Sequence, residues 1–533
     1  MNSSTEPSSQ RVETELLLPT SFNQQSALFT LPQKGLLDGD LQLQLSLQAA
    51  NANQRMPLNV GILGCIDTIT MYYNNELIQQ TRNVAYKARM NNTFVEPEVR
   101  NQTHNVQFGA FDGLEVKAGN AGGAATSFAG QYYLNREIVG LENTTVGSAD
   151  ALIPANALNN MDRATGFRIE NDASTPEYRV KLKTLLPILG QVSLPLGLLT
   201  GRFTIQIDWV RDIIGNRVVP TSSWTNANPS VETQNPFVAG NNIVQNNCQL
   251  IVDYIYFDEV PDKKSPMDLI AEQMASSGLD LIYTDYVNID ISLPNLLAAN
   301  IPAVGAPIRK EYQHFLGLDH QVVRNITCAL PRQVDTTETL QGGRMNTIYG
   351  KYESVASMGP NTLQLSCNNQ PVFPLPLNMD PKLYQALSEV YGSPCKLNQG
   401  QTSWYNQTGG TDRVVFPYEF FGSSGTIQAP GGVGATYRLA PRVFGKSWTY
   451  TLDTANDIKM NGVNATEQYL GINLAHTKEN IANAGLTIGR SPITIRLVRS
   501  LTSQLWEAQQ LLCWAECERQ MTLRSGTIFV SGS

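Results

Sequence analysis

Apolar and polar residues alternate with a period of two in several stretches of the chain. The clearest are 41–48 (LQLQLSLQ), 202–210 (RFTIQIDWV) and 492–498 (PITIRLV). Because successive side chains of a β-strand point to opposite faces, this alternation predicts strands with one buried and one solvent-facing side. In 41–48 the leucines are expected inside and the glutamines and Ser46 outside. Such strands, joined by long glycine-rich polar loops, predict an all-β protein.

The middle of the chain has a different pattern. Residues 250–257 are apolar or aromatic apart from Asp253, which predicts a strand buried on both faces. Ser265, Pro266 and Asp268 then form the N-cap, first-turn proline and first-turn acid of a helix that ends at 276–278. A strand followed at once by a capped helix predicts a boundary between two units.

Two further segments have helical character. The sequence 380–392 (DPKLYQALSEVYG) starts with an Asp cap and a proline and stops at a glycine, so it predicts a helix. The segment 503–521 has helical propensity too, but its apolar pattern continues into 519–530 (RQMTLRSGTIFV) and favours a long strand.

An internal echo indicates tandem domains. Residues 67–80 (DTITMYYNNELIQQ) and 361–374 (NTLQLSCNNQPVFP) both read as strand, Asn-Asn turn and strand. A chain of 533 residues also exceeds what one hydrophobic core accommodates. Chance similarity of two short segments is the alternative explanation.

The charge balance of the chain argues against nucleic acid as a partner. The chain has 38 Lys and Arg against 46 Asp and Glu, a net charge of -8, and no basic cluster, so we expect no direct binding of nucleic acid.

The most apolar window, 185–199, contains two prolines and is too short for a transmembrane segment. The polar start, 1–13, reads as a flexible tail without signal-peptide character. Seven cysteines at irregular spacing predict buried free thiols.

Searches for chemistry find no catalytic, cofactor-binding or metal-binding residues, so we expect no enzyme activity and no cofactor. The Gly-Lys-Ser triplet at 445–447 lacks the preceding glycine of a phosphate-binding loop. The four histidines fit no metal motif, and a metal shared by His314 and His320 is an alternative to ordinary polar roles. Trp224, Trp404 and Tyr405 are expected to anchor loops, with stacking on sugars as the alternative.

The junction resembles that between the two domains of double jelly-roll major capsid proteins of eukaryotic DNA viruses, and the chain length suits polinton-like viruses and virophages within that lineage. The matching residues are Val252, Asp253, Tyr254, Ile255, Tyr256 and Asp258, with Phe257 in place of a commoner leucine. Segments 64–81 and 185–209 resemble the early hairpin and the proline-punctuated approach to a long strand in that family. The second half matches mainly through 363–376 and 519–533.

The resemblance implies two tandem eight-stranded antiparallel jelly rolls with long loops and a few short helices. We expect a tail at 1–13, a first jelly roll at 14–262, a linking helix at 263–279 and a second jelly roll at 280–533.

It further implies a homotrimer that forms a pseudo-hexagonal capsomer in an icosahedral virion shell assembled inside the host cell. Contacts with neighbouring capsomers, and with penton and minor capsid or cement proteins, follow from the same resemblance. The main alternative is a carbohydrate-binding β-sandwich surface protein, and a glycosidase with β-sandwich domains is a third possibility.

Overall fold

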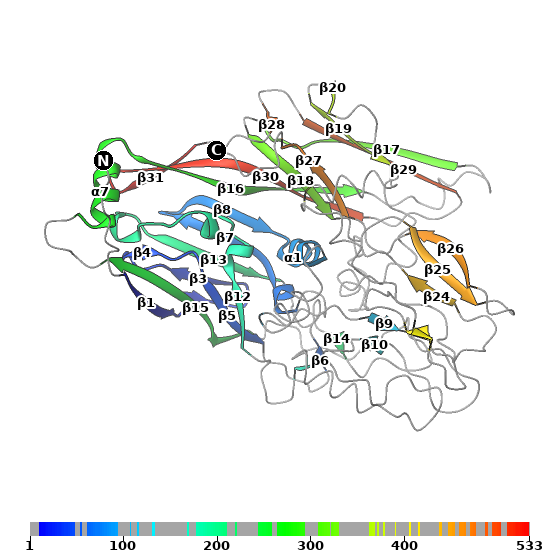
Figure 1. Cartoon of the computed structure of the whole chain (residues 1–533), viewed down its shortest axis with the longest axis horizontal. Coiled ribbons are helices and arrows are strands. Elements are labelled where there is room, and N and C mark those ends of the chain that lie inside the picture. The colour runs from blue at the N-terminus through cyan, green and yellow to red at the C-terminus, as the bar shows by residue number, and fades with distance from the viewer. Residues whose placement is uncertain are drawn as a thin grey trace.

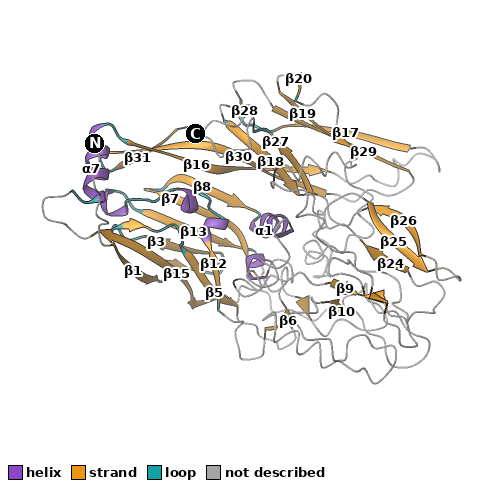
Figure 2. Ribbon diagram, viewed as in Figure 1, coloured by secondary structure: helices purple, strands orange, loops and turns teal. Residues whose placement is uncertain are grey.

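The structure of the 533-residue chain is a computed structural model. It describes the backbone of residues 10–47, 54–55, 61–93, 107, 114–116, 131–133, 168–169, 177–210, 219–220, 243–257, 264–293, 307–319, 321–329, 362–367, 370–372, 377–378, 390, 405–406, 414–415, 436–439, 446–452, 458–464, 469–475, 486–488, 493–502 and 509–531. Strands dominate these ranges (Figure 2).

The first half of the chain forms two antiparallel sheets around one core (Figure 1). One sheet has the order β1-β15-β5-β12, and these strands span Gln10–Leu17, Ile243–Phe257, Gln42–Leu47 and Tyr178–Lys181. The other has the order β2-β3-β13-β7-β8, with the bounds Ser21–Phe22, Ser26–Thr30, Phe203–Trp209, Ile66–Tyr73 and Glu76–Arg82. A short β4 (Leu36–Leu37) pairs with β15.

The second half repeats this arrangement. One sheet has the order β16-β30-β18-β27, with the bounds Leu279–Leu293, Gln509–Arg524, Val322–Ala329 and Tyr469–Asn473. The other has the order β17-β29-β19-β20, with the bounds Pro307–Phe315, Ile493–Thr502, Thr362–Cys367 and Gln370–Pro371. Three short strands extend these sheets: β28 (Leu486–Thr487) on β18, β31 (Thr527–Ser531) on β30 and β21 (Leu377–Asn378) on β19.

Both halves have the same strand order. The eight principal strands are, in chain order, β1, β3, β5, β7, β8, β12, β13 and β15 in the first half, and β16, β17, β18, β19, β20, β27, β29 and β30 in the second. Numbered by rank, each half places strands 1-8-3-6 in one sheet and 2-7-4-5 in the other. This is the order of a jelly roll, in which two Greek keys fold over each other. The predicted fold of two tandem jelly rolls is confirmed.

Smaller elements complete the described ranges. The helices are η1 (Gly61–Cys65), α1 (Val84–Thr93), η4 (Leu182–Thr184), α5 (Ile188–Gln191), η5 (Leu196–Leu198) and α7 (Pro266–Ser276). The small sheets contain β6 (Gln54–Arg55), β9 (Leu114–Val116), β10 (Gln131–Tyr133), β11 (Arg168–Ile169), β14 (Val219–Pro220), β22 (Tyr405–Asn406), β23 (Val414–Val415), β24 (Thr436–Leu439), β25 (Lys446–Leu452) and β26 (Ile458–Asn464).

The alternating strands have the predicted inner faces. Every second residue of β13, starting at Phe203, is buried, as are Ile493, Ile495 and Leu497 of β29. The prediction for β5 was wrong on its polar face, because Ser46 is fully buried there. Gln44 on the same face is buried as well, so other parts of the fold cover both faces of β5 at these positions.

The strand and helix at the middle of the chain match their prediction. Ser265 caps α7 and forms a capping box with Asp268, and the chain leaves the helix through Gly278 with a positive φ of 87°. Along β15, Leu250 and Tyr254 are buried, but its last residues, 255–257, are half-buried. Burial on both faces therefore holds only for the first part of the predicted strand.

The two hairpins of the internal echo occupy equivalent positions. Asn74 and Asn75 both have positive φ, 48° and 69°, and connect β7 to β8 as a tight turn. In the second half, β19 pairs with β20 through Cys367 and Gln370, and the two asparagines between them lie outside the described residues. Both hairpins join strands of rank 4 and 5, so the echo reflects the repeated topology.

The prediction for the C-terminal segment is confirmed, whereas part of the predicted N-terminal tail is a strand. Segment 509–524 is the long strand β30, as favoured from its pattern. At the other end, β1 begins at Gln10 and pairs with β15, so the last four residues of the predicted tail form a strand. The predicted helix 380–392 lies outside the described residues apart from Val390.

Each sandwich has its own apolar core, and the first core includes residues from the second half of the chain. Met274, Tyr283, Met521, Leu523 and Ile528 pack into the first core. The core of the first sandwich therefore crosses the predicted boundary at 263–279, because β16 and the β30–β31 hairpin lie against it (Figure 1).

Candidate functional site

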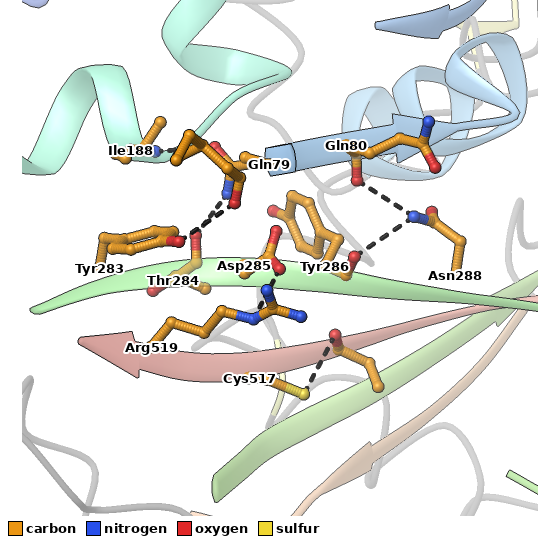
Figure 3. Close-up of polar contacts among 12 residues, drawn as sticks. Gln79, Gln80, Ile188, Tyr283, Thr284, Asp285, Tyr286, Asn288, Cys517 and Arg519 are labelled. Carbon is orange, nitrogen blue, oxygen red and sulfur yellow. Dashed lines mark hydrogen bonds and ion pairs between the residues drawn. The ribbon is translucent and has the colours of Figure 1, made fainter. Parts of the chain in front are cut away.

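The contact between the two sandwiches is the most elaborate polar arrangement among the described residues. It brings together β8, the last strand of its sheet, and β16, the first strand of the adjoining sheet (Figure 3). An edge strand presents unpaired N–H and C=O groups, and edges of this kind readily pair with one another. Here β8 and β16 do not form a backbone ladder over their described lengths, and side chains make the contact instead.

Side chains of the second sandwich satisfy carbonyl groups of β8 at three alternate positions. Tyr283 Oη donates to Ile78 O (3.1 Å), Asn288 Nδ2 donates to Gln80 O (3.1 Å), and Trp514 Nε1 donates to Arg82 O (3.0 Å). A buried carbonyl without such a partner costs about 1–3 kcal/mol. These three donors therefore allow the edge of β8 to be covered.

The backbone of β16 is satisfied in the same manner from the first sandwich. Gln79 Nε2 donates to Thr284 O (2.6 Å), and Gln191 Oε1 accepts from Thr284 N (2.7 Å). The other amide atom of Gln79, Oε1, accepts from Ile188 N (3.1 Å) at the start of α5. Gln79 is fully buried, so its amide connects three elements at the centre of the contact.

A buried ion pair lies beside these amides. Arg519 Nε of β30 is 2.9 Å from Asp285 Oδ2 of β16, and both side chains are largely buried (Figure 3). Burial raises the pKa of Asp285 to about 6, against the opposing attraction of Arg519. Desolvation thus outweighs the ion pair, and Asp285 is easier to protonate than an exposed carboxyl group.

A buried lysine closes the other end of the contact. Lys87, on α1, donates from Nζ to Thr327 Oγ1 (3.1 Å), and Nζ lies 4.7 Å and 5.5 Å from the ring centres of Tyr286 and Trp514. Burial lowers its pKa to about 8. The aromatic faces attract the ammonium group and take the place of an anionic partner in contact with it.

The turn between β30 and β31 makes a second contact with the first sandwich. Gly526 O accepts from Tyr73 Oη (3.0 Å) and from Thr200 N and Oγ1 (both 2.9 Å). Tyr73 Oη also accepts from Gly201 N (2.9 Å), where an added Cβ would lie 2.4 Å from the Tyr73 ring. The tip of the C-terminal hairpin is therefore held in a fitted site on the first sandwich.

The strand equivalent to β16 in the first sandwich is β1, and its outward face is uncovered. Val12 and Leu16 are 57% and 61% exposed and lie opposite Ile255 and Ile251 on the same face of the sheet. Thr14 Oγ1 donates to Asp253 Oδ1 between them. The strand of this rank is thus buried at 283–285 in the second sandwich, whereas in the first it exposes Val12 and Leu16.

Those candidate chemical residues that the structure describes do not assemble into a site. His314 lies half-buried on β17, whereas His104, His320 and His476 lie outside the described residues. Trp224 and Trp404 also lie outside them, and Tyr405 begins the short β22. Within the described ranges, no three His, Cys, Asp or Glu side chains are grouped as metal ligands. Nor does any helix in those ranges combine the length and apolar character needed to cross a bilayer.

Sequence reasoning missed the residues that make the contact. Gln79, Lys87 and Asp285 were not singled out, because each lies in an element that carries several other polar residues. The local sequence therefore carries no signal that sets these three residues apart, because their burial depends on partners far away in the chain.

Comparison with known proteins supports the fold. No family model matches the chain, and no curated protein matches it. Among solved structures, a chain of the Sputnik virophage determined by cryo-electron microscopy has a TM-score of 0.51 at 12% identity, over 100% of this chain and 90% of that one.

Two further solved structures are similar. The Faustovirus major capsid protein has a TM-score of 0.49 at 11% identity, over 98% and 92% of the two chains. A chain of the PBCV-1 virus capsid has 0.48 at 9%, over 100% and 99%. The Sputnik likeness, together with the strand order in both halves, shows that this chain has the double jelly-roll fold.

Proposed function

We propose that this chain is a major capsid protein with a structural, non-enzymatic role in the shell of a virion. The observation that carries the proposal is the pair of jelly rolls with identical strand order, fixed side by side in one chain. Two rigid sandwiches in a fixed relation form a block that tiles a surface. The likeness to a chain of the Sputnik virophage, which extends over the whole of this chain, supports a place in a virus particle.

We infer that the capsomer is a homotrimer. Within the chain, an edge strand of the second sandwich, β16, is covered by β8 of the first. The equivalent strand of the first sandwich, β1, exposes Val12 and Leu16. A second copy that covers β1 gives each sandwich two neighbours, and three chains then close into a ring of six sandwiches with a pseudo-hexagonal outline.

The proposed domains are a first jelly roll at 14–262 and a second at 280–533, joined by the helix segment 263–279, with a tail at 1–13. The first range takes in β1 from Thr14 onward and ends after β15, and the second takes in β16 from Asp280 onward and continues to β31. In the assembled shell we expect contacts with neighbouring capsomers and with penton and minor capsid proteins.

The test is the solution mass of the purified chain, measured by light scattering, with negative-stain images of the same sample. Three copies of the 58.6 kDa chain give about 176 kDa, and a hexagonal outline is expected. A monomer at all concentrations, without particles on co-expression with other virion proteins, contradicts the proposal.

A glycan array run on the same sample separates the main alternative. Specific binding of a glycan by a persistent monomer favours a carbohydrate-binding β-sandwich protein. A trimer without glycan binding favours the capsid role.

A further inference from the structure

Two buried cysteines face each other inside the second sandwich. Cys328 of β18 and Cys513 of β30 are directly opposite partners in the antiparallel ladder. Their Sγ atoms lie 3.1 Å apart, and each residue is only 1% exposed. Residues opposite each other on antiparallel strands have Cα atoms about 4.5–5.5 Å apart, within the range of about 4.4–6.8 Å that disulfides need. The backbone is therefore already placed for a bond.

The surroundings hold this pair in register. β30 lies between β16 and β18, and its pairing with β16 continues without a shift from Leu279 to Leu293. Thr327 and Trp514 are the adjoining pair of the ladder and lie on the other face, where Lys87 contacts both. The two sulfur atoms thus belong to the core of the second sandwich, in a part of the sheet fixed from both sides.

We propose that Cys328 and Cys513 are a latent redox pair that forms a cross-strand disulfide when the protein meets a peroxide. The bond joins residues 185 positions apart and fastens β18 to β30 at the middle of the six-stranded sheet. A bond across so long a stretch of chain restricts the unfolded ensemble strongly. This proposal does not depend on the capsid role.

The chemistry balances with hydrogen peroxide as the oxidant. The peroxide oxygen transfers to one thiolate, which becomes a sulfenic acid, and hydroxide leaves and takes up a proton. The second sulfur then attacks the first, so that the S–S bond forms, the S–O bond breaks and water departs. In total, two thiols and one peroxide give one disulfide and two waters.

Reactivity is held low in the folded, reduced protein. The hydrogen bond with Cys328, together with burial, holds the pKa of the Cys513 thiol well above its usual value. Because the thiolate is the reactive form, oxidation is expected to be slow at neutral pH and faster as the pH rises. A pair of this kind remains reduced inside a cell and closes only on prolonged exposure.

The test uses the intact chain. Purified protein is treated with increasing concentrations of hydrogen peroxide. It is then denatured in the presence of N-ethylmaleimide, which blocks the remaining free thiols. Trypsin digestion and tandem mass spectrometry follow. The expected product joins peptide 325–332 to peptide 500–519 through Cys328 and Cys513, with the loss of two hydrogen atoms. The oxidised protein is expected to melt on the order of 5 °C higher, and dithiothreitol should reverse the shift.

Cys517 provides the matched control because it shares peptide 500–519 but lies opposite Val323. Cys517→Ser should keep the cross-link and the shift in melting temperature, whereas Cys328→Ser and Cys513→Ser should lose both. The wild-type arm needs no variant to fold. Recovery of both cysteines as alkylated or over-oxidised residues, at doses that oxidise the methionines in the same digest, overturns the proposal. A cross-link through Cys517 in the wild type does so too.

Discussion

The two strands of rank 1, β16 and β1, occupy the same place in their jelly rolls and have opposite surroundings. β16 lies against the first sandwich, and Tyr283, Thr284 and Asp285 on it are buried. β1 has the same edge position but leaves Val12 and Leu16 open. The difference teaches that topology alone does not decide whether an edge is covered.

Side chains that can satisfy a neighbour's backbone distinguish the covered edge. Gln79 and Asn288 carry amides that bond to main-chain atoms across the contact. These bonds prevent a continuous ladder from forming while leaving few backbone groups unsatisfied. On β1 the exposed apolar side chains of Val12 and Leu16 suit burial by another protein surface.

The largest expected effect comes from breaking the buried ion pair of the covered edge. Arg519→Ala leaves Asp285 buried without its partner, so we expect the free energy of unfolding to fall by about 3–5 kcal/mol at pH 7. Urea denaturation of the wild type and of Arg519→Ala measures this loss in the free energy of unfolding. The control at the open edge is Arg11→Ala, whose guanidinium lies 5.2 Å from the Tyr256 ring centre and is exposed, and which should cost under about 0.5 kcal/mol. Equal losses for both variants would contradict the comparison.

A second prediction uses pH to test the carboxyl group of Asp285. The pKa of Asp285 is raised from 3.8 to about 6, so the folded state binds a proton more tightly than the unfolded state. The resulting stabilisation is present below about pH 4 and is lost as the pH rises through 6. Between pH 7 and pH 4 the wild type should therefore gain roughly 2 kcal/mol in free energy of unfolding relative to Asp285→Asn. Unfolding curves of both proteins across this range give the difference, and a flat difference would argue against a buried, titrating Asp285.

The amide that connects the two sandwiches should have a smaller effect. Gln79→Met keeps the volume but leaves Thr284 O and Ile188 N without their partners, so we expect a loss of roughly 2 kcal/mol. Gln80→Met is the matched control, because the bond from Asn288 reaches the backbone oxygen of Gln80 and survives the change. The free energy of unfolding of Gln80→Met should fall by less than about 1 kcal/mol. Thermal and urea unfolding of the two variants in parallel provide the measurement.

The smallest effect on folding, and the clearest on assembly, is expected at the open edge. Val12→Asp with Leu16→Asp should change the free energy of unfolding by no more than about 0.5 kcal/mol, because both side chains are exposed. The same pair of charges should abolish the trimer in light scattering if β1 is covered by a second copy. Leu269→Asp, at another exposed leucine on α7, should leave the mass unchanged. A double variant that still forms the trimer would place the subunit contact elsewhere.

Local features were predictable from the sequence. The Asn-Asn turn, the capping box at Ser265 and the alternation of β13 each depend on residues within a few positions of one another. Buried free thiols were also predicted, and five of the six described cysteines are buried, with Cys367 half-buried and Cys395 outside the described residues. The internal echo and the family resemblance both predicted the tandem arrangement, which the strand orders confirm.

Features that failed or were missed depend on distant neighbours. Ser46 was expected in water because its strand alternates, yet the alternation does not reveal that both faces of β5 are covered. Gln79 meets Thr284 across 205 positions, and no local pattern indicates such a partner.

The sequence by itself determined where strands, turns and the central helix form, because hydrophobic period, capping and turn chemistry act over short distances. It also determined that two similar units follow one another. Only the tertiary structure decided which edge strand is covered, which carboxyl group is buried beside Arg519 and which two cysteines face each other. These outcomes follow from strand pairing and sandwich contact between residues hundreds of positions apart, where burial changes the free energy of a charge or a thiol.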